Sequence, residues 1–261
     1  MIGAIIGDVV GSRFEFHNIK TKDFQFWHDD CHTTDDTILT CAVADWLLHG
    51  GAPEKYLFAW GNRYKNKTFE NGTIPAFGPG FTNWLHTKKP YNAKTNGCIM
   101  RLAPIFDFYS DNLNKMLYTA ETLTNTTHNH PDSIHATRAY IETGYMLKNK
   151  ADVAKIKKII SEKYNYNLNQ TVDEIRPNYN KFYTTCKNSV PQAIVCALDA
   201  TDYTDTIRNA ISIGGDSDTI ATMSGALAEI RFGVPNELQN TVIKYLDKNM
   251  IKIINSVGRV K

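Results

Sequence analysis

Several protein classes are excluded by what the sequence has little of. It contains only five cysteines in 261 residues, and no two of them form a C-x-x-C pair. An odd number of cysteines without paired spacing argues against a disulfide framework and against a zinc ribbon. This usage favours a reducing compartment, where a buried thiol serves as a small apolar side chain.

The sequence also lacks an excess of charge and long apolar runs. Its formal net charge is only +2, and its mildly basic stretch, 148–163, is typical of the solvated face of an amphipathic helix. The sequence therefore gives no strong electrostatic signal for nucleic-acid binding. No apolar run approaches the roughly 20 residues that span a bilayer. The apolar N-terminus has no basic region and contains Asp8, which argues against a secretory signal. We expect a cytoplasmic, monomeric protein without a membrane partner.

Strand-like alternation is scarce as well, and only residues 22–28 (KDFQFWH) resemble it. Helical spacing of apolar residues dominates instead. This spacing predicts helices over 2–11, 36–48, 133–148, 152–163, 189–198, 203–212, 218–232 and 236–254. Because the sequence has no repeat and no linker composition, we predict one all-α domain over residues 1–261.

Glycine has two distinct uses in this chain. Gly3, Gly7 and Gly11 recur every four residues in the first predicted helix, which gives that helix a small face for close approach of another backbone. Residues 71–101, in contrast, form a predicted loop that is rich in Gly, Pro, Asn and aromatic residues. A loop of this length inside a compact domain is more often functional than idle.

Two acidic clusters stand at the starts of predicted helices. Residues 33–37 read TTDDT, and residues 214–219 read GGDSDT. One interpretation is helix capping, because Ser, Thr and Asp are preferred at helix starts and the helix dipole favours acids there. A cap needs one oxygen, however, and each of these helix starts offers at least three. Surplus carboxylates are costly to bury unless a positive charge offsets them.

The second interpretation is a metal site. If the two helix starts meet, four carboxylates lie together and need cations to stay ionised. Oxygen ligands suit Mg²⁺ or Mn²⁺ rather than zinc, and four carboxylates could hold two such ions. An EF-hand is excluded because its loop glycine and its terminal glutamate are missing. Sequence spacing does not show whether the helix starts meet, so capping and metal binding both stay open.

Six stretches of the chain match one known family in order. They are GAIIGDVVGSRFE (3–15), TTDDT (33–37), TNGCIMRLAPI (95–105), THNHPDSIHAT (127–137), CKNSVPQAI (186–194) and IGGDSDTIATMSGALAE (213–229). In these stretches the sequence resembles the ADP-ribosylglycohydrolase family, which includes dinitrogenase reductase-activating glycohydrolase and the ADP-ribosyl-acceptor hydrolases. The resemblance implies an orthogonal all-α bundle, a site for two Mg²⁺ or Mn²⁺ ions, and hydrolysis at C1″ of the ADP-ribose moiety of a modified protein or small molecule.

Carried over motif by motif, the resemblance implies roles for individual residues. The implied metal ligands are Thr34, Asp35, Asp36, Asp216, Asp218 and Thr219. The implied ADP-ribose contacts are Asn96, Gly97, Cys98 and Met100, in the loop that holds the diphosphate, together with His128. Glu15 matches a mobile-loop glutamate and is expected to serve in catalysis with Asp36 and Asp218. Under this hypothesis the metals bind the 2″ and 3″ hydroxyls of the distal ribose, and a water activated there and oriented by Asp218 attacks C1″.

Some residues near these motifs keep two interpretations. Asp8 either supports the metal ligands or bonds a helix end, and Arg101 either reaches a phosphate or pairs with an acid. His32 either lines the pocket or lies on the surface. We expect no ligand role for His130 and Asp132, because a proline separates them and the clusters supply only oxygen ligands.

Two further groups have a structural and a functional interpretation. Phe77, Phe81 and Trp84 are the candidates for stacking on adenine. Cys186 and Ser189 have no visible base partner, so we expect Ser189 to cap a helix that has Pro191 in its first turn rather than to act as a nucleophile.

Two other functions remain as alternatives to hydrolysis of ADP-ribosyl bonds. The first is a catalytically silent member that binds ADP-ribose or serves structurally, although such a member need not keep all six implied ligands. The second is an unrelated metal-dependent hydrolase of phosphate esters, which would need Lys or Arg beside the acids. The acceptor stays open, because arginine, serine, O-acetyl and nucleobase linkages differ only at the leaving group.

Overall fold

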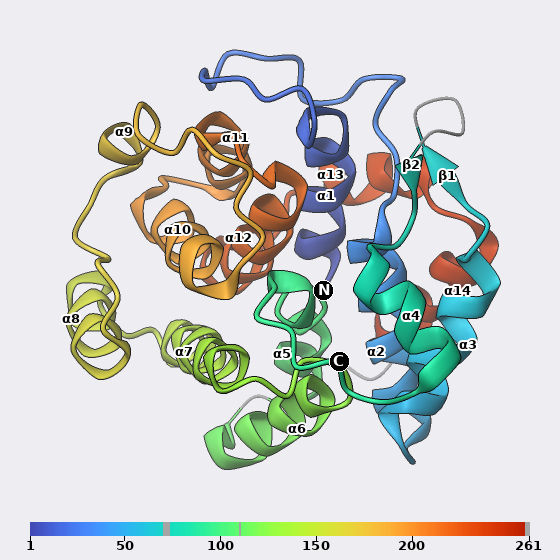
Figure 1. Cartoon of the computed structure of the whole chain (residues 1–261). Helices are drawn as coiled ribbons and strands as arrows, with labels where there is room; N and C mark the ends of the chain where they lie inside the picture. Colours follow the sequence, from blue (N-terminus) through green and yellow to red (C-terminus); the bar gives the residue numbers. More distant parts are fainter. Residues whose placement is uncertain (70–73, 110, 259–261) are drawn as a thin grey trace.

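Helices make up nearly all the regular structure of the protein. The computed structural model describes residues 1–69, 74–109 and 111–258. Its α-helices, shown in Figure 1, are α1 (Ile2–Gly11), α2 (Asp35–His49), α3 (Pro53–Tyr64), α4 (Pro79–Thr87), α5 (Ala103–Phe108), α6 (Leu113–Asn125), α7 (Pro131–Lys148), α8 (Val153–Tyr164), α9 (Val172–Ile175), α10 (Cys186–Asp199), α11 (Tyr203–Ile213), α12 (Ser217–Phe232), α13 (Asn236–Val242) and α14 (Lys248–Gly258). Within the described residues, 3₁₀ helices cover Ser12–Phe14 (η1), Asn96–Cys98 (η3) and Ile243–Tyr245 (η4). The predicted all-α class is confirmed.

Helix α1 packs against α12 at the centre of the molecule (Figure 1). A Cβ atom on Gly7 would stand 2.2 Å from the carbonyl oxygen of Ala221, and one on Gly11 would stand 2.5 Å from the Cα atom of Asp218. No side chain fits in either gap, so the close approach predicted from the glycine spacing is confirmed. The same contact holds the start of α12 against the end of α1.

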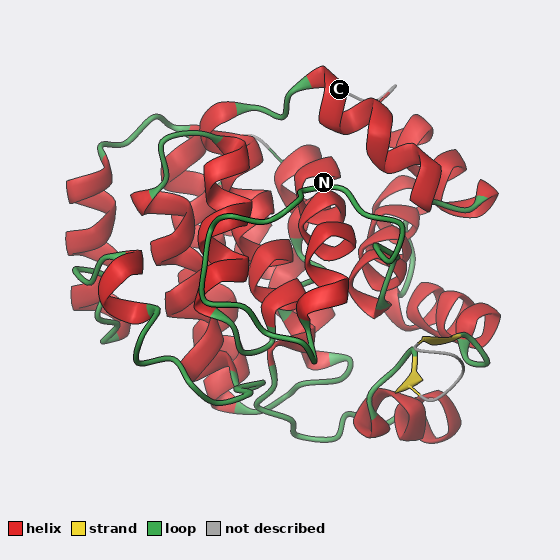
Figure 2. Cartoon of the chain, turned by 90° about the horizontal axis from the view of Figure 1, so that it is seen from above, coloured by secondary structure: helices red, strands yellow, loops and turns green. Residues whose placement is uncertain are grey.

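Several other helices lie on two sides of this central pair. Helices α10 and α11 flank α12, while α2, α3 and α14 lie on the other side of α1 (Figure 1). Many of the helices run roughly side by side, with the long connections at their ends (Figure 2). None of the helices in the described parts of the chain is both long enough and apolar enough to cross a bilayer.

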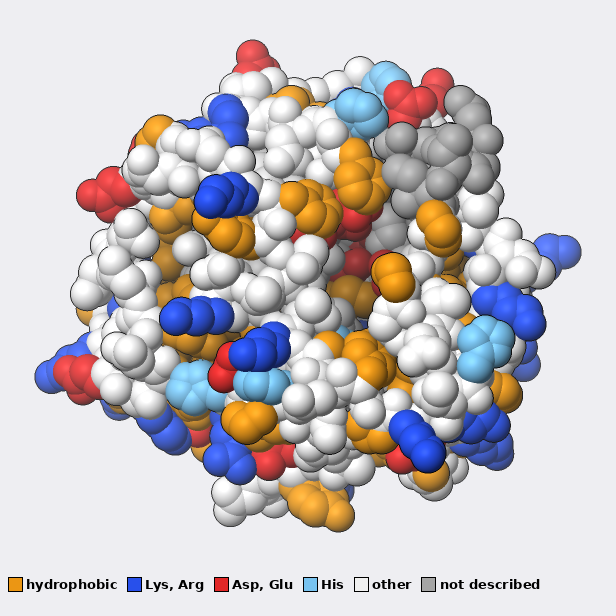
Figure 3. Space-filling view, viewed as in Figure 1, with side chains coloured by type: hydrophobic (Ala, Val, Ile, Leu, Met, Phe, Trp, Pro, Cys, Tyr) orange, Lys and Arg blue, Asp and Glu red, His pale blue; other side chains and the backbone are white. Residues whose placement is uncertain are grey.

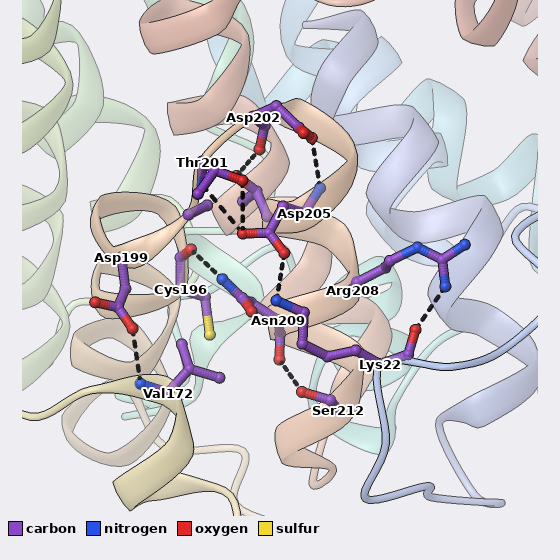
Figure 4. Close-up of polar contacts among 12 residues, drawn as sticks. Lys22, Val172, Cys196, Asp199, Thr201, Asp202, Asp205, Arg208, Asn209 and Ser212 are labelled. Carbon is purple, nitrogen blue, oxygen red and sulfur yellow. Dashed lines mark hydrogen bonds and ion pairs between the residues drawn. The ribbon is translucent and has the colours of Figure 1, made fainter.

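The segment that follows η1 is fixed along α11 (Figure 4). Lys22 forms an ion pair with Asp205 near the start of α11. The ammonium of Lys20 donates to three backbone carbonyl oxygens, those of Arg176, Tyr179 and Ile213. The Asn18 side chain donates to the carbonyl oxygen of Gly215 and accepts from its N–H. These bonds tie the chain immediately after Glu15 to the turn between α11 and α12.

Residues 22–28, whose alternation resembles that of a strand, contain no strand. Arg208 of α11 donates to the carbonyl oxygens of Lys22 and Phe24 at 2.6 and 2.9 Å. Its guanidinium also lies 4.8 Å from the centroid of the Phe24 ring. The alternating aromatic residues therefore bind a helix surface rather than another strand. The short strands β1 (Thr68–Phe69) and β2 (Ile74–Pro75) pair antiparallel instead.

Two predicted helix boundaries and one predicted loop are wrong. The span 236–254 is broken before α14, because the Asp247 carboxylate accepts from the backbone N–H groups of Asn249 and Met250 and so caps a new helix. Helix α10 begins at Cys186 rather than after Ser189, whose hydroxyl donates to a carbonyl within the helix. Its extra first turn is held by a 2.8 Å bond from the Cys186 N–H to the carbonyl oxygen of Lys94.

The third of these predictions concerns the long loop 71–101. It contains α4 and η3, although residues 71–73 lie outside the described residues. Pro79 stands in the first turn of α4, where a missing N–H costs nothing, and the left-handed Lys88 ends this helix. The Gly and Pro content that predicts a loop therefore also marks the ends of a short helix.

Candidate active site

A cavity of about 1150 Å³ opens beside the starts of α2 and α12. All six predicted metal ligands line it, namely Thr34, Asp35, Asp36, Asp216, Asp218 and Thr219. Glu15, Phe16 and Phe182 also line it, and the two phenylalanine rings stack with their centroids 5.6 Å apart. Figure 3 shows acidic side chains inside a hollow that has apolar side chains at its rim. Small-ligand sites commonly combine a mostly apolar wall with a few convergent polar groups in this way.

The two acidic clusters meet at this cavity. The Thr219 hydroxyl donates to Asp36 Oδ2 at 3.3 Å, which links the start of α12 directly to the start of α2. Carboxylate oxygens of Asp8, Asp36 and Asp218 lie within 4.8 Å of one another, as do those of Glu15, Asp216 and Asp218. The condition that sequence spacing left open is therefore met.

Capping accounts for only part of the first cluster and for none of the aspartates of the second. The Thr34 hydroxyl accepts from the N–H of Asp36 and so caps α2. Neither Asp35 nor Asp36 is therefore needed as the cap of this helix. Asp216 stands at the N-cap position of α12, but its side chain makes no capping bond. Gly214 and Gly215 precede it with φ of +74° and +75°. These left-handed residues turn the chain sharply enough to bring the Asp216 side chain into the cavity.

Asp8 bonds the start of helix α2, which is one of the two interpretations of this residue. Its carboxylate accepts from the N–H groups of Thr34 and Thr37 at 3.0 Å each, and from the Thr34 hydroxyl at 2.6 Å. Asp8 is fully buried in α1. It therefore fixes the start of α2 from a neighbouring helix and also contributes to the group of acids with Asp36 and Asp218.

The acids of the site repel one another in a dry environment. Burial raises the pKa of Asp36 and Asp218 well above the usual range, and neighbouring carboxylates raise it further. Burial and the charges of Asp8 and Asp216 raise the pKa of Asp35 to about 8. A group of acids perturbed in this way, inside a cavity, is typical of a functional site.

The same acids fit divalent cations. Asp36 Oδ1 and Asp218 Oδ1 are buried and have no hydrogen-bond partner among the residues described. Buried polar atoms are otherwise almost always paired, so these oxygens have unused acceptor capacity that points to a missing partner. Because every neighbouring ligand atom is an oxygen, the set suits Mg²⁺ or Mn²⁺.

The predicted diphosphate loop adjoins the acids. Asn96 donates from Nδ2 to Asp216 Oδ2 at 2.6 Å, and Asn96, Gly97 and Met100 line the cavity. Cys98 is fully buried and is not among the lining residues; its thiol lies 3.8 Å from that of Cys186. Any contact of Cys98 with a ligand would therefore be made by its backbone.

His128 also lines the cavity, beside Gly97 and Tyr91. Its imidazole bonds two threonine hydroxyls, with Nε2 2.9 Å from Thr95 Oγ1 and Nδ1 2.7 Å from Thr127 Oγ1. Burial, and to a lesser degree the nearby Arg101 charge, lower the pKa of His128 to about 3. The imidazole is therefore neutral at physiological pH.

Arg101 is a fully buried cation at the cavity wall. It donates from Nη2 to Thr127 Oγ1 at 2.6 Å, and its Nε has no partner in the described part of the chain. No ion pair of Arg101 with an acid occurs among the described residues. Its pairing with an acid, one of the two interpretations, is thus not observed.

The aromatic candidates divide into two kinds. Phe77 and Phe81 line the cavity, whereas Trp84 is fully buried behind Phe81, stacked on it at 5.3 Å, and donates to the carbonyl oxygen of Thr126. Sequence reasoning missed Tyr91, which lines the same cavity. The position of Tyr91 in a Gly- and Pro-rich loop was the only available signal.

Three polar residues near the motifs lie outside the cavity lining. His32 is half-buried and does not line it. His130 caps α7 by accepting from the N–H of Asp132. Neither His130 nor Asp132 belongs to a group of possible metal ligands among the residues described.

The chain is similar to a known family and to a solved structure. Residues 1–255 match the family model described as ADP-ribosylglycohydrolase. No curated protein matched the chain. Among solved structures, the chain is similar to one described as an "ADP-ribosylglycohydrolase-related protein complex", with a TM-score of 0.69 and 18% identity over 99% of this chain and 96% of that one. At this identity the likeness shows a shared fold.

Proposed function

Because the chain belongs to the ADP-ribosylglycohydrolase family, we propose that it is a hydrolase that releases ADP-ribose from ADP-ribosylated acceptors with the help of two Mg²⁺ or Mn²⁺ ions. One observation carries the metal dependence. Asp36 Oδ1 and Asp218 Oδ1 are buried at the meeting point of α2 and α12 without hydrogen-bond partners among the described residues. Bound cations would give these oxygens partners and would allow the surrounding carboxylates to remain ionised.

Six side chains from the two helix starts would hold the ions, namely those of Thr34, Asp35, Asp36, Asp216, Asp218 and Thr219. Divalent ions bound by these residues would supply a Lewis acid for orienting ribose hydroxyls and activating water. Asp8 holds Thr34 in place, and Asn96 holds Asp216. The protein therefore positions one ligand of each cluster through a neighbouring element, which is typical of metal sites.

Contacts around the cavity support one order for the parts of ADP-ribose along it. The acids adjoin Asn96, and Gly97 packs against His128. His128 adjoins Tyr91, which in turn contacts the start of α4 and so leads to Phe81. We place the distal ribose at the acids, the diphosphate at the loop 96–100, and adenine beside the aromatic residues of α4.

We propose that Glu15 moves a proton during the reaction. Its carboxylate lies with those of Asp216 and Asp218, the ligand atoms all within 4.8 Å, at the side of the cavity that carries Phe16 and Phe182. A carboxylate here could hold the proton that the attacking water loses and return it to the leaving group.

We further propose a cytoplasmic location, which is supported by five free and buried cysteines.

The test uses a panel of acceptors and two variants. Wild-type protein with Mg²⁺ is incubated with ADP-ribosylated arginine, serine, O-acetyl and nucleic-acid substrates, and ADP-ribose release and bound metal are measured. We expect release from at least one substrate, and loss of both bound metal and release in Asp36→Asn and Asp216→Asn. Full activity in either variant would contradict the metal site. Tight ADP-ribose binding without turnover of any substrate would favour the catalytically silent alternative.

A further inference from the structure

Four side chains beside the cavity form a continuous line of hydrogen bonds. Arg101 Nη2 lies 2.6 Å from Thr127 Oγ1, which lies 2.7 Å from His128 Nδ1. At the other edge of the imidazole, His128 Nε2 lies 2.9 Å from Thr95 Oγ1. The line begins at a fully buried guanidinium and ends at a half-buried threonine that lines the cavity. We call these four residues the relay.

The relay has a fixed direction because one end of it can only donate. A guanidinium has no acceptor, so the Thr127 oxygen accepts from Arg101. Thr127 is fully buried, and among the described residues the one acceptor within reach of its hydroxyl hydrogen is His128 Nδ1. The opposite tautomer would leave this buried hydrogen without a partner, which is costly. Thr127 therefore donates to Nδ1, and the imidazole carries its hydrogen on Nε2.

This tautomer decides what the last residue does. Since Nε2 donates, the Thr95 oxygen accepts from His128, and the Thr95 hydroxyl hydrogen is left to point elsewhere. Thr95 precedes Asn96 and faces the same cavity as Gly97. The imidazole stays neutral because burial and the Arg101 charge both oppose its protonation. The relay thus leaves the Thr95 hydroxyl hydrogen available to a group in the cavity.

We propose that the relay fixes Thr95 as a hydrogen-bond donor to a phosphoryl oxygen of the bound ADP-ribose, so that Thr95 is a binding residue and Arg101, Thr127 and His128 are its positioning residues. This inference rests on the proposed function, because it takes ADP-ribose as the ligand. A phosphoryl oxygen only accepts, and a hydroxyl locked as a donor matches it. The buried Arg101 cation polarises this line of hydrogen bonds.

The test combines tautomer detection with binding of free ADP-ribose in the presence of Mg²⁺. We expect ¹⁵N NMR of wild-type protein to show a neutral His128 with its hydrogen on Nε2. Thr95→Val should bind ADP-ribose about 10-fold more weakly, as expected for a lost hydrogen bond to a charged group, and Thr95→Ser should restore affinity. Thr127→Val should redistribute the His128 tautomers and weaken binding several-fold, with less than additive effects in the double variant.

Thr137→Val is the matched control. Its hydroxyl is also fully buried and bonds another threonine, Thr124, at 3.0 Å. Thr137 does not line the cavity, so this variant should keep the wild-type affinity and tautomer. A hydrogen on Nδ1 in wild-type protein, or wild-type affinity in Thr95→Val, would overturn the relay while leaving the proposed function intact. Failure of wild-type protein to bind ADP-ribose would overturn both.

Discussion

The start of α11 and the start of α12 each carry two aspartates, yet their carboxylates have different partners. In α11, Asp202 accepts from the N–H of Asp205, and Asp205 binds Lys22 and the N–H of Thr201 (Figure 4). In α12, Asp216 makes no capping bond and Asp218 Oδ1 has no partner among the described residues. The protein satisfies the carboxylates of the first pair, whereas one oxygen of the second pair, Asp218 Oδ1, stays unused among the described residues.

The pKa values of Asp205 and Asp218 shift in opposite directions because their carboxylates have different partners. Burial alone would raise the pKa of Asp205, but the hydrogen bonds and charge of Lys22 and the bonds from Thr201 outweigh burial and lower it. Burial raises the pKa of Asp218 well above the usual range, and Glu15 and Asp36 add to this rise. Aspartate at a helix start is thus no evidence of a site by itself. The evidence is a buried oxygen for which the protein supplies no donor.

The largest expected contrast is in activity. Asp218→Asn should reduce ADP-ribose release by at least about 100-fold, because even outer-shell partners of a metal contribute about 10–100-fold. Asp205→Asn should keep wild-type activity while losing about 1 kcal/mol of unfolding free energy. Turnover measured with the substrate found in the acceptor panel, together with urea unfolding, tests both. An active Asp218→Asn would remove the distinction between the two helix starts.

Much of this contrast could not be predicted from the sequence. Apolar spacing predicts α1, α2, α7, α8, α11 and α12 to within a few residues, and the two acidic clusters can be recognised in the sequence. The spare oxygens of Asp36 and Asp218 cannot be recognised there, because they depend on which donors the folded chain brings to each helix start. At the start of α2, for example, Asp8 takes the N–H groups of Thr34 and Thr37. The relay of Arg101 and His128 could not be predicted either, because the spacing of residues in the sequence does not show where a hydroxyl group points.

The second contrast is in how stability depends on pH and metal. Without metal, the raised pKa values of Asp35, Asp36 and Asp218 mean that the folded protein binds more protons than the unfolded chain. Their contribution is fully present below the unfolded pKa and is lost as pH rises, for Asp35 through about 8. Asp205 has a lowered pKa and acts in the opposite sense, losing its contribution as pH falls.

Added Mg²⁺ should therefore stabilise the protein most at the upper end of this range. Saturation at about 100 times Kd adds about 2.7 kcal/mol. Melting temperatures measured across pH with chelator and with Mg²⁺ would show this difference. In Asp218→Asn the Mg²⁺ effect should be greatly reduced, whereas Asp205→Asn should keep it. Equal Mg²⁺ effects in the two variants would mean that the ion acts elsewhere.

A third contrast concerns how the backbone positions Asp218. Gly11→Ala would place a Cβ atom 2.5 Å from the Asp218 Cα atom, whereas Gly7→Ala would meet Ala221 one turn further along α12. Both should cost about 1–3 kcal/mol of unfolding free energy through overpacking. Only Gly11→Ala should also lower activity beyond what its folded fraction explains. Equal specific activities in the two folded variants would show that this contact does not set the Asp218 position.

The smallest expected effect is that of Lys22→Gln. The Lys22 side chain is 39% exposed and Asp205 is 19% exposed, so solvent screens the pair and its loss should cost less than about 1 kcal/mol. The cost should shrink further in high salt, because screening weakens an exposed pair. Activity should not change, since Lys22 does not line the cavity. Urea unfolding at low and high salt measures the difference. A salt-independent loss would mean that Lys22 acts through packing of its aliphatic stem against α11 rather than through its charge.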